Sequence, residues 1–440
     1  MTEEPPAAGA PPQGGTAHPI IETGRRVAGL DPADLVRAHG SPLFVYDLGV
    51  IAERVELLRA ALPANAELAF AVKSNPNPAV LAHLAGLGVG ADVASMGELE
   101  AVTRAGFDLR QVVFTGPGKT DAEIAKAVRT GIRALTIESL EELEVVIDLG
   151  SVAASRQGIL LRLAIDGAGT AEESTPIISG PGAGKFGLTP DEVDQAVDRL
   201  FLAGAVGSAG APFELLGLHA FGASNVRDAS KLVENVRALA ARAEKVAKRH
   251  GFKVRLMDGG GGLGIPYADD ETPLDLDALR DGLAAEVATW AKRPGIAGAH
   301  LLFEPGRFLV GPAGAYLMRV VRTKVRNGRT IAVTDGGIHH LMRPALIGEQ
   351  QRTVLVGEAA TREGAGAADV VGPLCTGLDV LATSVPMAAP RTGDLLAIRD
   401  TGAYGFTESM PFFLSHPIPA EVCLREGRVV AARPRVAPRV

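Results

Sequence analysis

The stretch LAFAVKSNPNPAVLAHLAGLGVGADVAS, residues 68–95, contains the smallest unit from which a fold can be inferred. It starts with an apolar run that ends at Lys73 and finishes with a second run that ends at Ser95. Between the two runs, apolar side chains recur at the spacing of one helical face, at Val80, Leu81, Leu84 and Leu87. A strand, a helix and a strand in this order pair in parallel through a right-handed crossover. The stretch therefore predicts one β/α unit.

The same rhythm continues for about 260 residues, a length typical of a (β/α)₈ barrel. Eight apolar strand candidates occur: LAFAVK, VGADVAS, QVVFTG, ALTIES, GILLRLAI, LLGLHAFG, VRLMDGGG and HLLFEPG, between residues 68 and 306. Periodicity alone leaves a doubly wound open sheet as a competing arrangement. The barrel is the fold that we expect.

After Arg307 the sequence changes to a β pattern with few helical stretches. AYLMRVVRTKVRNGRTIAVTD, residues 315–335, carries Asn327-Gly328 between two strand-like runs, which indicates a hairpin. We therefore expect a disordered tail at 1–18, a barrel at 47–305, and a mainly β domain formed by 19–46 and 306–440. The short strand LFVYD at 43–47 fits either half.

Composition limits the function classes. The 440 residues carry 44 basic and 51 acidic side chains, a net charge of −7, which gives no electrostatic reason to expect nucleic acid or an acidic membrane as partner. There is no apolar run long enough to span a membrane. The acidic, Pro-rich start does not look like a signal peptide. Two cysteines cannot form a disulfide framework or a Cys-based zinc site. A soluble, cytoplasmic protein is expected.

In a barrel, catalytic groups lie at the carboxyl ends of the strands, which meet at one mouth. An amine, a glycine-rich turn, a hydroxyl, carboxylates and an arginine occur at these strand ends, and together they suit a cofactor that carries a phosphate and an electrophilic carbonyl. Lys73 closes an apolar strand, and we expect burial to lower its pKa and activate its amine. The residues at or just beyond the strand ends are Lys73, Asp92, Gly116, Glu138, Ser224, Gly260, Gly261, Gly262, Glu304 and Arg307.

Each of these residues also has an ordinary structural interpretation. Most lysines are solvated, and a glycine run is often only a flexible loop, although its place after a strand favours a backbone nest for phosphate. Cys375 follows Gly372-Pro373, which suggests a loop from which the thiol reaches a site, whereas a buried core cysteine is commoner. His339 and His340 on a strand would point to opposite faces, and we expect no metal site.

Seven ordered motifs between Pro42 and Val422 resemble those of fold-type III pyridoxal-phosphate decarboxylases, a family that includes diaminopimelate and ornithine decarboxylases. The resemblance implies pyridoxal 5'-phosphate at the mouth of a barrel, a β domain, and a homodimer with shared active sites. The motifs are FAVKSNPNP, GADVASMGELE, GLHAFGAS, LMDGGGGLGIPY, FEPGR, GPLCTGLD and DTGAYGF.

The resemblance also implies roles for single residues. Lys73 matches the lysine that holds the cofactor covalently, and Glu304 matches the carboxylate that pairs with its ring nitrogen. Cys375 matches the residue that protonates the product carbon and arrives from the partner subunit. The remaining implied cofactor residues are Asp92, Phe221, Ser224, Gly260, Gly261, Gly262, Arg307 and Tyr404, and the implied substrate residues are Arg307, Arg343 and Thr376.

Three positions depart from the family pattern. Phe221 stands where a histidine usually stacks on the cofactor ring. Thr376 follows the cysteine where diamine-specific members carry an acid, so that a buried distal ammonium would lack a partner. Ile347 replaces a tyrosine expected in diaminopimelate decarboxylases. These departures disfavour a free diamino acid.

GPLCT, DGGIHH and FLSHPIPAE resemble decarboxylases that act on amino acids tethered to acyl carrier proteins in antibiotic biosynthesis. The expected function is decarboxylation of a glutamyl or methylaspartyl thioester on a carrier protein. Diaminopimelate decarboxylase is the alternative, favoured by LGIPY, RPAL and PAEV. A non-catalytic pyridoxal-phosphate carrier is a third, which the β domain and Cys375 disfavour.

Overall fold

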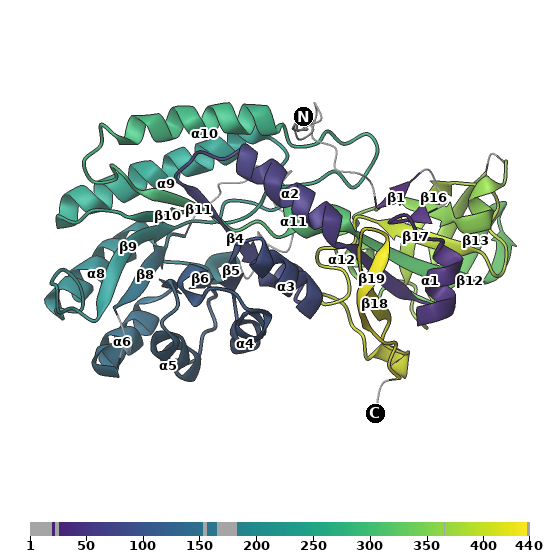
Figure 1. Cartoon of the computed structure of the whole chain (residues 1–440), viewed down its shortest axis with the longest axis horizontal. Coiled ribbons are helices and arrows are strands. Elements are labelled where there is room, and N and C mark those ends of the chain that lie inside the picture. Colours follow the sequence, from purple (N-terminus) through teal and green to yellow (C-terminus); the bar gives the residue numbers. More distant parts are fainter. Residues whose placement is uncertain (1–19, 23–25, 153–155, 165–182, 365, 438–440) are drawn as a thin grey trace, which may run out of the picture.

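The computed structural model describes residues 20–22, 26–152, 156–164, 183–364 and 366–437. In Figure 1 a barrel surrounded by helices lies beside a sheet domain, and the long helix α2 (Leu48–Ala60) runs from the barrel toward the sheets. The predicted tail at 1–18 lies outside the described residues.

The strand pattern at 68–306 forms a closed barrel of eight parallel strands, as predicted. The order is β10-β11-β4-β5-β6-β7-β8-β9, and β10 also pairs with β9, which closes the ring and excludes the open sheet. The strands are β4 (Ala66–Ala71), β5 (Gly90–Val93), β6 (Val112–Phe114), β7 (Ala134–Ile137), β8 (Gln157–Arg162), β9 (Phe213–His219), β10 (Leu256–Asp258) and β11 (His300–Phe303).

Helices cover the outside of the barrel and begin at side-chain caps. The Ser95 side chain accepts from the Glu98 backbone N–H, and Thr120 and Glu123 cap each other reciprocally. Besides α2, the helices are α3 (Pro78–Gly86), α4 (Met96–Ala105), α5 (Asp121–Thr130), α6 (Leu140–Asp148), α8 (Pro190–Leu202), α9 (Ala229–His250) and α10 (Leu276–Trp290).

The second domain is a nine-stranded, mostly antiparallel sheet. Asn327 and Gly328, both at positive φ, form the two-residue turn between β12 and β13, as the sequence predicts. The segment LFVYD is β3, which pairs with β12 and β18 and so belongs to this sheet. The strands are β3 (Leu43–Asp47), β12 (Gly314–Arg326), β13 (Arg329–Thr334), β14 (Thr353–Val356), β15 (Ala367–Val371), β16 (Val380–Pro386), β17 (Leu395–Arg399), β18 (Ala420–Arg425) and β19 (Arg428–Arg433).

Shorter elements complete the described chain. The helix α1 (Pro32–His39) and the strands β1 (Ile21–Glu22) and β2 (Arg26–Val27) precede β3, while α11 (Arg307–Val310) follows the barrel and α12 (Arg343–Ile347) follows β13. Among the helices of the described ranges, none combines the length and apolarity needed to cross a bilayer.

Hydrogen bonds between the two domains hold the loop that follows β4. Asn77 Nδ2 donates to Glu421 Oε1 at 3.3 Å, and Asn75 Nδ2 donates to the carbonyl of Gly402 at 2.8 Å. The backbone N–H of Tyr404 donates to the carbonyl of Ser74 at 2.8 Å. The β domain therefore holds the segment that directly follows Lys73.

Candidate active site

Lys73 lies in the single 3₁₀ turn η1 (Val72–Ser74) that ends β4, and its ammonium meets a buried carboxylate. Lys73 Nζ lies 2.7 Å from Oδ2 of Asp92 in β5, while the lysine side chain as a whole is 47% exposed. Burial of the amine lowers the pKa of Lys73, but the charges of Asp92 and Glu304 outweigh it and raise that pKa. The expectation of a lowered pKa is therefore wrong for this arrangement, because two carboxylates face the amine.

Three buried groups, His219, Asp258 and Glu304, meet at the ends of the adjacent strands β9, β10 and β11. His219 Nε2 lies 3.6 Å from Glu304 Oε2, and the nitrogen and oxygen atoms of the three groups lie within 4.8 Å of one another. The resemblance implies no metal there, and we assign none.

The two carboxyl groups of this cluster, Glu304 and Asp258, differ in how readily they ionise. Burial opposes ionisation of Glu304, but His219 and Lys73 outweigh it and lower the pKa of Glu304 to about 2. Burial, and then the negative charge of Glu304, raise the pKa of Asp258 well above its ordinary value. Glu304 is therefore the more readily ionised carboxyl of the pair, and the neutral form of Asp258 is favoured over that of an isolated aspartate.

The glycine run after β10 is packed rather than open. A Cβ at Gly261 or Gly262 would lie closer than 3.0 Å to the carbonyl oxygen of Glu304 or Ala223, and Gly260 and Gly262 have positive φ. The Gly260 N–H donates to Asp258 Oδ1 at 2.9 Å. The run therefore holds the segment 220–226, which carries Phe221 and Ser224, against the Glu304 strand end, and the flexible-loop interpretation is disfavoured.

Arginines and tyrosines form a second cluster beside Lys73. The guanidinium carbon of Arg307 lies 5.0 Å from the centre of the Tyr404 ring, and that of Arg343 lies 5.3 Å from the same ring. Arg307 also donates to the hydroxyl of Tyr267, a residue of the LGIPY motif. Tyr404, next to Lys73 through its backbone bond to Ser74, connects the two clusters.

Arg343 is already bound to two acids. Its Nη1 donates to Glu408 Oε2 at 2.9 Å and its Nε donates to Glu349 Oε1 at 3.3 Å. Burial lowers the pKa of Arg343, but the charges of Glu349, Tyr267 and Glu408 raise it. The guanidinium is therefore charged and paired within the chain.

Cys375 and Thr376 do not join either cluster. They lie in the loop between β15 and β16, where the cysteine is exposed. Asp379 holds this loop, because its carboxylate accepts from the N–H groups of Leu374 at 2.7 Å and Ile338 at 2.8 Å.

The histidine pair differs from the prediction. His339 and His340 lie in a turn, and their ring centres are 3.7 Å apart instead of facing opposite sides of a strand. The reason is that the Asp379 carboxylate binds the Ile338 backbone and folds this segment against the cysteine loop.

Two other predicted rim positions serve the scaffold. Glu138 accepts from the N–H groups of Gly116 at 2.8 Å and Gly187 at 3.2 Å and pairs with Arg162 at 2.8 Å. These contacts tie neighbouring strand ends together and satisfy both carboxylate oxygens.

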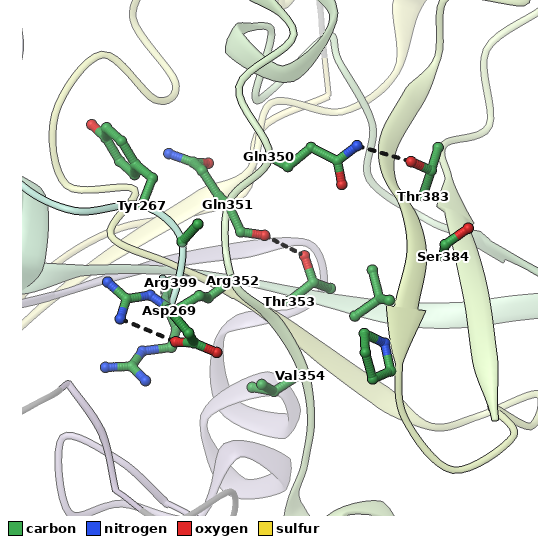
Figure 2. Close-up of a pocket in the computed structure, with 13 residues that line it drawn as sticks. Tyr267, Asp269, Gln350, Gln351, Arg352, Thr353, Val354, Thr383, Ser384 and Arg399 are labelled. Carbon is green, nitrogen blue, oxygen red and sulfur yellow. Dashed lines mark hydrogen bonds and ion pairs between the residues drawn. The ribbon is translucent and has the colours of Figure 1, made fainter. Parts of the chain in front are cut away.

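A pocket of about 380 Å³ opens elsewhere, between residues 267–269 and the strands β14 and β16 (Figure 2). Arg352 Nη1 lies 3.4 Å from Asp269 Oδ1 there, and Gln350 donates to Thr383 at 2.9 Å. None of the residues predicted from the sequence lines this pocket, but it borders the arginine and tyrosine cluster at Tyr267, which lines the pocket and accepts from Arg307.

Sequence reasoning missed four of these residues. His219 and Asp258 are the last residues of β9 and β10, so the strand-end rule would have found them had it been applied at the strand end instead of at the glycines and serine that follow. Glu349 and Glu408 come from loops with no recognisable pattern.

The buried polar atoms at the mouth fit pyridoxal phosphate. Several have no hydrogen-bond partner among the described residues, which is costly unless a ligand supplies one. They are Asp92 Oδ1, Asp258 Oδ2, Glu304 Oε1 and both ring nitrogens of His219. A lysine amine, an ionised carboxylate and a packed glycine run at one mouth match an aldehyde, a protonated ring nitrogen and a phosphate.

Comparison with known proteins also indicates a protein that binds pyridoxal phosphate. The family described as "Pyridoxal-dependent decarboxylase, pyridoxal binding domain" matches residues 48–311. A diaminopimelate decarboxylase of Methanothermobacter thermautotrophicus is 32% identical over 93% of this chain and 92% of its own length. An L-glutamyl-[BtrI acyl-carrier protein] decarboxylase of Niallia circulans is 28% identical over 90% and 92%.

Solved structures share the fold over both domains. A diaminopimelate decarboxylase from M. jannaschii in co-complex with L-lysine has a TM-score of 0.84 and 26% identity, and the match covers 94% of each chain. The match spans the β domain as well as the barrel, whereas a carrier that consists of a barrel alone would match only over the barrel. The chain belongs to the pyridoxal-dependent decarboxylases, lyases that use pyridoxal 5'-phosphate.

Proposed function

We propose that this decarboxylase acts on an amino acid whose side-chain carboxyl is held as a thioester on an acyl carrier protein, of the glutamyl or methylaspartyl type. The observation that carries the proposal is the pairing of Arg343 with Glu349 and Glu408. Arg343 is one of the predicted substrate residues; we infer that it faces the distal end of the substrate, and here its charge is balanced inside the chain.

Residue roles at the mouth follow from the geometry and the resemblance. Lys73 would hold the cofactor covalently, Asp92 would orient the Lys73 amine, and Glu304 would pair with the ring nitrogen. When bound, pyridoxal phosphate supplies the electron-accepting ring that permits loss of the α-carboxylate. By the resemblance, Phe221 would stack on the cofactor ring. The residues on the phosphate side are Ser224, Gly260, Gly261, Gly262, Arg307 and Tyr404.

The distal end of the substrate decides between the two substrate classes. Free diaminopimelate carries a carboxylate and an ammonium at its far end. Its carboxylate would have to displace Glu349 or Glu408 from Arg343, and its ammonium would meet Thr376 where an acid is expected. A thioester has no charge at this end, so it leaves both ion pairs intact and requires no acid after Cys375.

The exposed cysteine loop supports a homodimer. Cys375 is exposed within one chain, and Leu378 beside it and Phe412 are 68% and 71% exposed. Phe412 belongs to a run of exposed apolar side chains with Met410, Phe413 and Leu414, and contiguous exposed apolar surface is typical of an interaction site. We infer that the partner subunit's Cys375 completes each site and supplies a proton to the product carbon.

Diaminopimelate decarboxylase is the second candidate, and the comparisons favour it. Relatives from Aquifex aeolicus, M. thermautotrophicus and Zymomonas mobilis that are 30–32% identical carry that name, whereas the carrier-protein decarboxylase is 28% identical.

Direct competition between the two substrates tests the proposal. The enzyme is given glutamyl and 3-methylaspartyl carrier proteins, and intact-protein mass spectrometry follows loss of carbon dioxide. Free meso-diaminopimelate is assayed in parallel by lysine formation. The proposal predicts a kcat/KM for one tethered substrate that exceeds the free one by at least about tenfold, or about 1.4 kcal/mol. Equal or faster turnover of diaminopimelate would establish the second candidate.

A further inference from the structure

His219, Asp258 and Glu304 are held by a rigid part of the scaffold. Asp258 lies opposite His219 in the β9–β10 ladder and opposite Leu302 in the β10–β11 ladder, and Glu304 follows two residues later. All three side chains are buried. The strand register therefore fixes their spacing.

Glu304 needs support from these neighbours. The charged and titratable groups that act on it are Lys73 from the end of β4, Asp92 from β5, His219 from β9 and Asp258 from β10. Among these neighbours, Asp92 and an ionised Asp258 would push Glu304 toward its neutral form. The Lys73 ammonium opposes them, but this amine is the group that the cofactor engages. His219 remains, with both ring nitrogens buried and without another hydrogen-bond partner among the described residues.

We propose that His219 and Asp258 are positioning residues that keep the Glu304 carboxylate ionised and in one orientation toward the ring nitrogen of the cofactor. His219 remains next to Glu304 and continues to stabilise its carboxylate when the Lys73 amine is bound to the cofactor. Asp258 is fully buried, within 4.8 Å of Glu304, and accepts from the Gly260 N–H, and in the proposed role it stays protonated and adds no second negative charge. The proposal does not depend on which amino acid is decarboxylated.

The role proposed for His219 is tested on the enzyme with bound cofactor and without substrate. The visible band of the bound cofactor is titrated with pH, and its loss on dilution gives the release rate. In His219→Leu the acid-side midpoint should rise by about one unit or more, and release should be about tenfold faster. His219→Gln, which keeps a neutral donor, should recover part of both effects and replaces the leucine variant if that variant does not fold.

The matched control is His300→Leu. This histidine lies at the first residue of β11, at the opposite end of the barrel. It should leave the midpoint and the release rate within about twofold of the parent values. If folded His219→Leu behaves like this control, while Glu304→Gln changes both readouts, the role of His219 is overturned.

The role proposed for Asp258 is tested with a variant that cannot ionise at this position. Asparagine has the shape of a neutral Asp258 and keeps the acceptor for Gly260, so Asp258→Asn should leave the midpoint within about half a unit. Were Asp258 ionised, the same variant would remove a like charge and move the midpoint down by about one unit or more. Such a downward shift in folded Asp258→Asn would refute the neutral role.

Discussion

Glu304 and Cys375 lie in two regions that differ in burial and in the number of strands that hold them. Glu304 is buried at the meeting point of three parallel strand ends, and side chains from four strands surround it. Cys375 is exposed in a loop that one carboxylate, Asp379, fastens to the neighbouring turn. The barrel mouth thus has its charged partners within one chain, whereas the cysteine loop is exposed, and in our proposal a second copy supplies the site on which it acts.

Subunit complementation gives the largest expected effect. Lys73→Ala should remove the covalently bound cofactor band and the activity. Cys375→Ala should keep the band and lose about 10²- to 10⁴-fold in kcat, the usual contribution of a proton-transferring group. If each site combines Lys73 of one subunit with the partner subunit's Cys375, a dissociated and reassociated equal mixture should regain about a quarter of the parent activity, because half of the dimers then contain one complete site.

Each variant mixed with itself is the control for this experiment. A mixture that stays as inactive as the separate variants, although size measurements show subunit exchange, would place both residues in one subunit's site or remove Cys375 from catalysis. Recovery would establish that the exposed loop of one chain serves the buried mouth of the other.

The two regions also differ in how far the sequence could predict them. Lys73, Asp92 and Glu304 follow from one rule, because parallel strands of a barrel bring their carboxyl ends to one mouth. Glu408 lies 65 residues from Arg343 along the chain, and their ion pair depends on how the short helix α12 and a distant loop pack together. No local periodicity encodes such a contact. The contact between His339 and His340 was missed for a related reason, since these residues lie in a turn whose Ile338 N–H donates to the Asp379 carboxylate, and no strand alternation applies there.

Lowering the pH should destabilise the turn that contains His339, which is joined to the cysteine loop, more than it destabilises the barrel mouth. Burial, together with the nearby His416, lowers the pKa of His339 to about 4 from its ordinary 6.5. Because the folded pKa is lowered, the stabilisation is complete above pH 6.5 and is lost as pH falls from 6.5 toward 4, when the unfolded chain takes up the proton. At pH 5 this loss is about 2 kcal/mol.

His339→Phe tests this difference, since it keeps a ring beside His340 and removes the titrating group. The free energy of unfolding, measured in denaturant at pH 7.5 and pH 5.0, should fall by about 2 kcal/mol less in the variant than in the parent. An equal fall in both proteins would show that His339 is hydrated in solution and does not titrate as a buried group.

The smallest expected effect concerns the charge balance around Arg343. Glu408 is partly exposed, with 27% of its side chain accessible, so its ion pair is worth less than a buried one. Glu408→Gln keeps a hydrogen-bond acceptor and frees part of the charge of Arg343 for a substrate carboxylate. The kcat/KM for free diaminopimelate should then rise about three- to tenfold, while that for a carrier-bound thioester stays the same or falls. Glu349→Gln should act in the same direction, because Glu349 shares the same guanidinium. If both variants lower the kcat/KM for diaminopimelate, the two acids orient Arg343 for a distal carboxylate instead of neutralising it, and the barrel mouth serves the free amino acid.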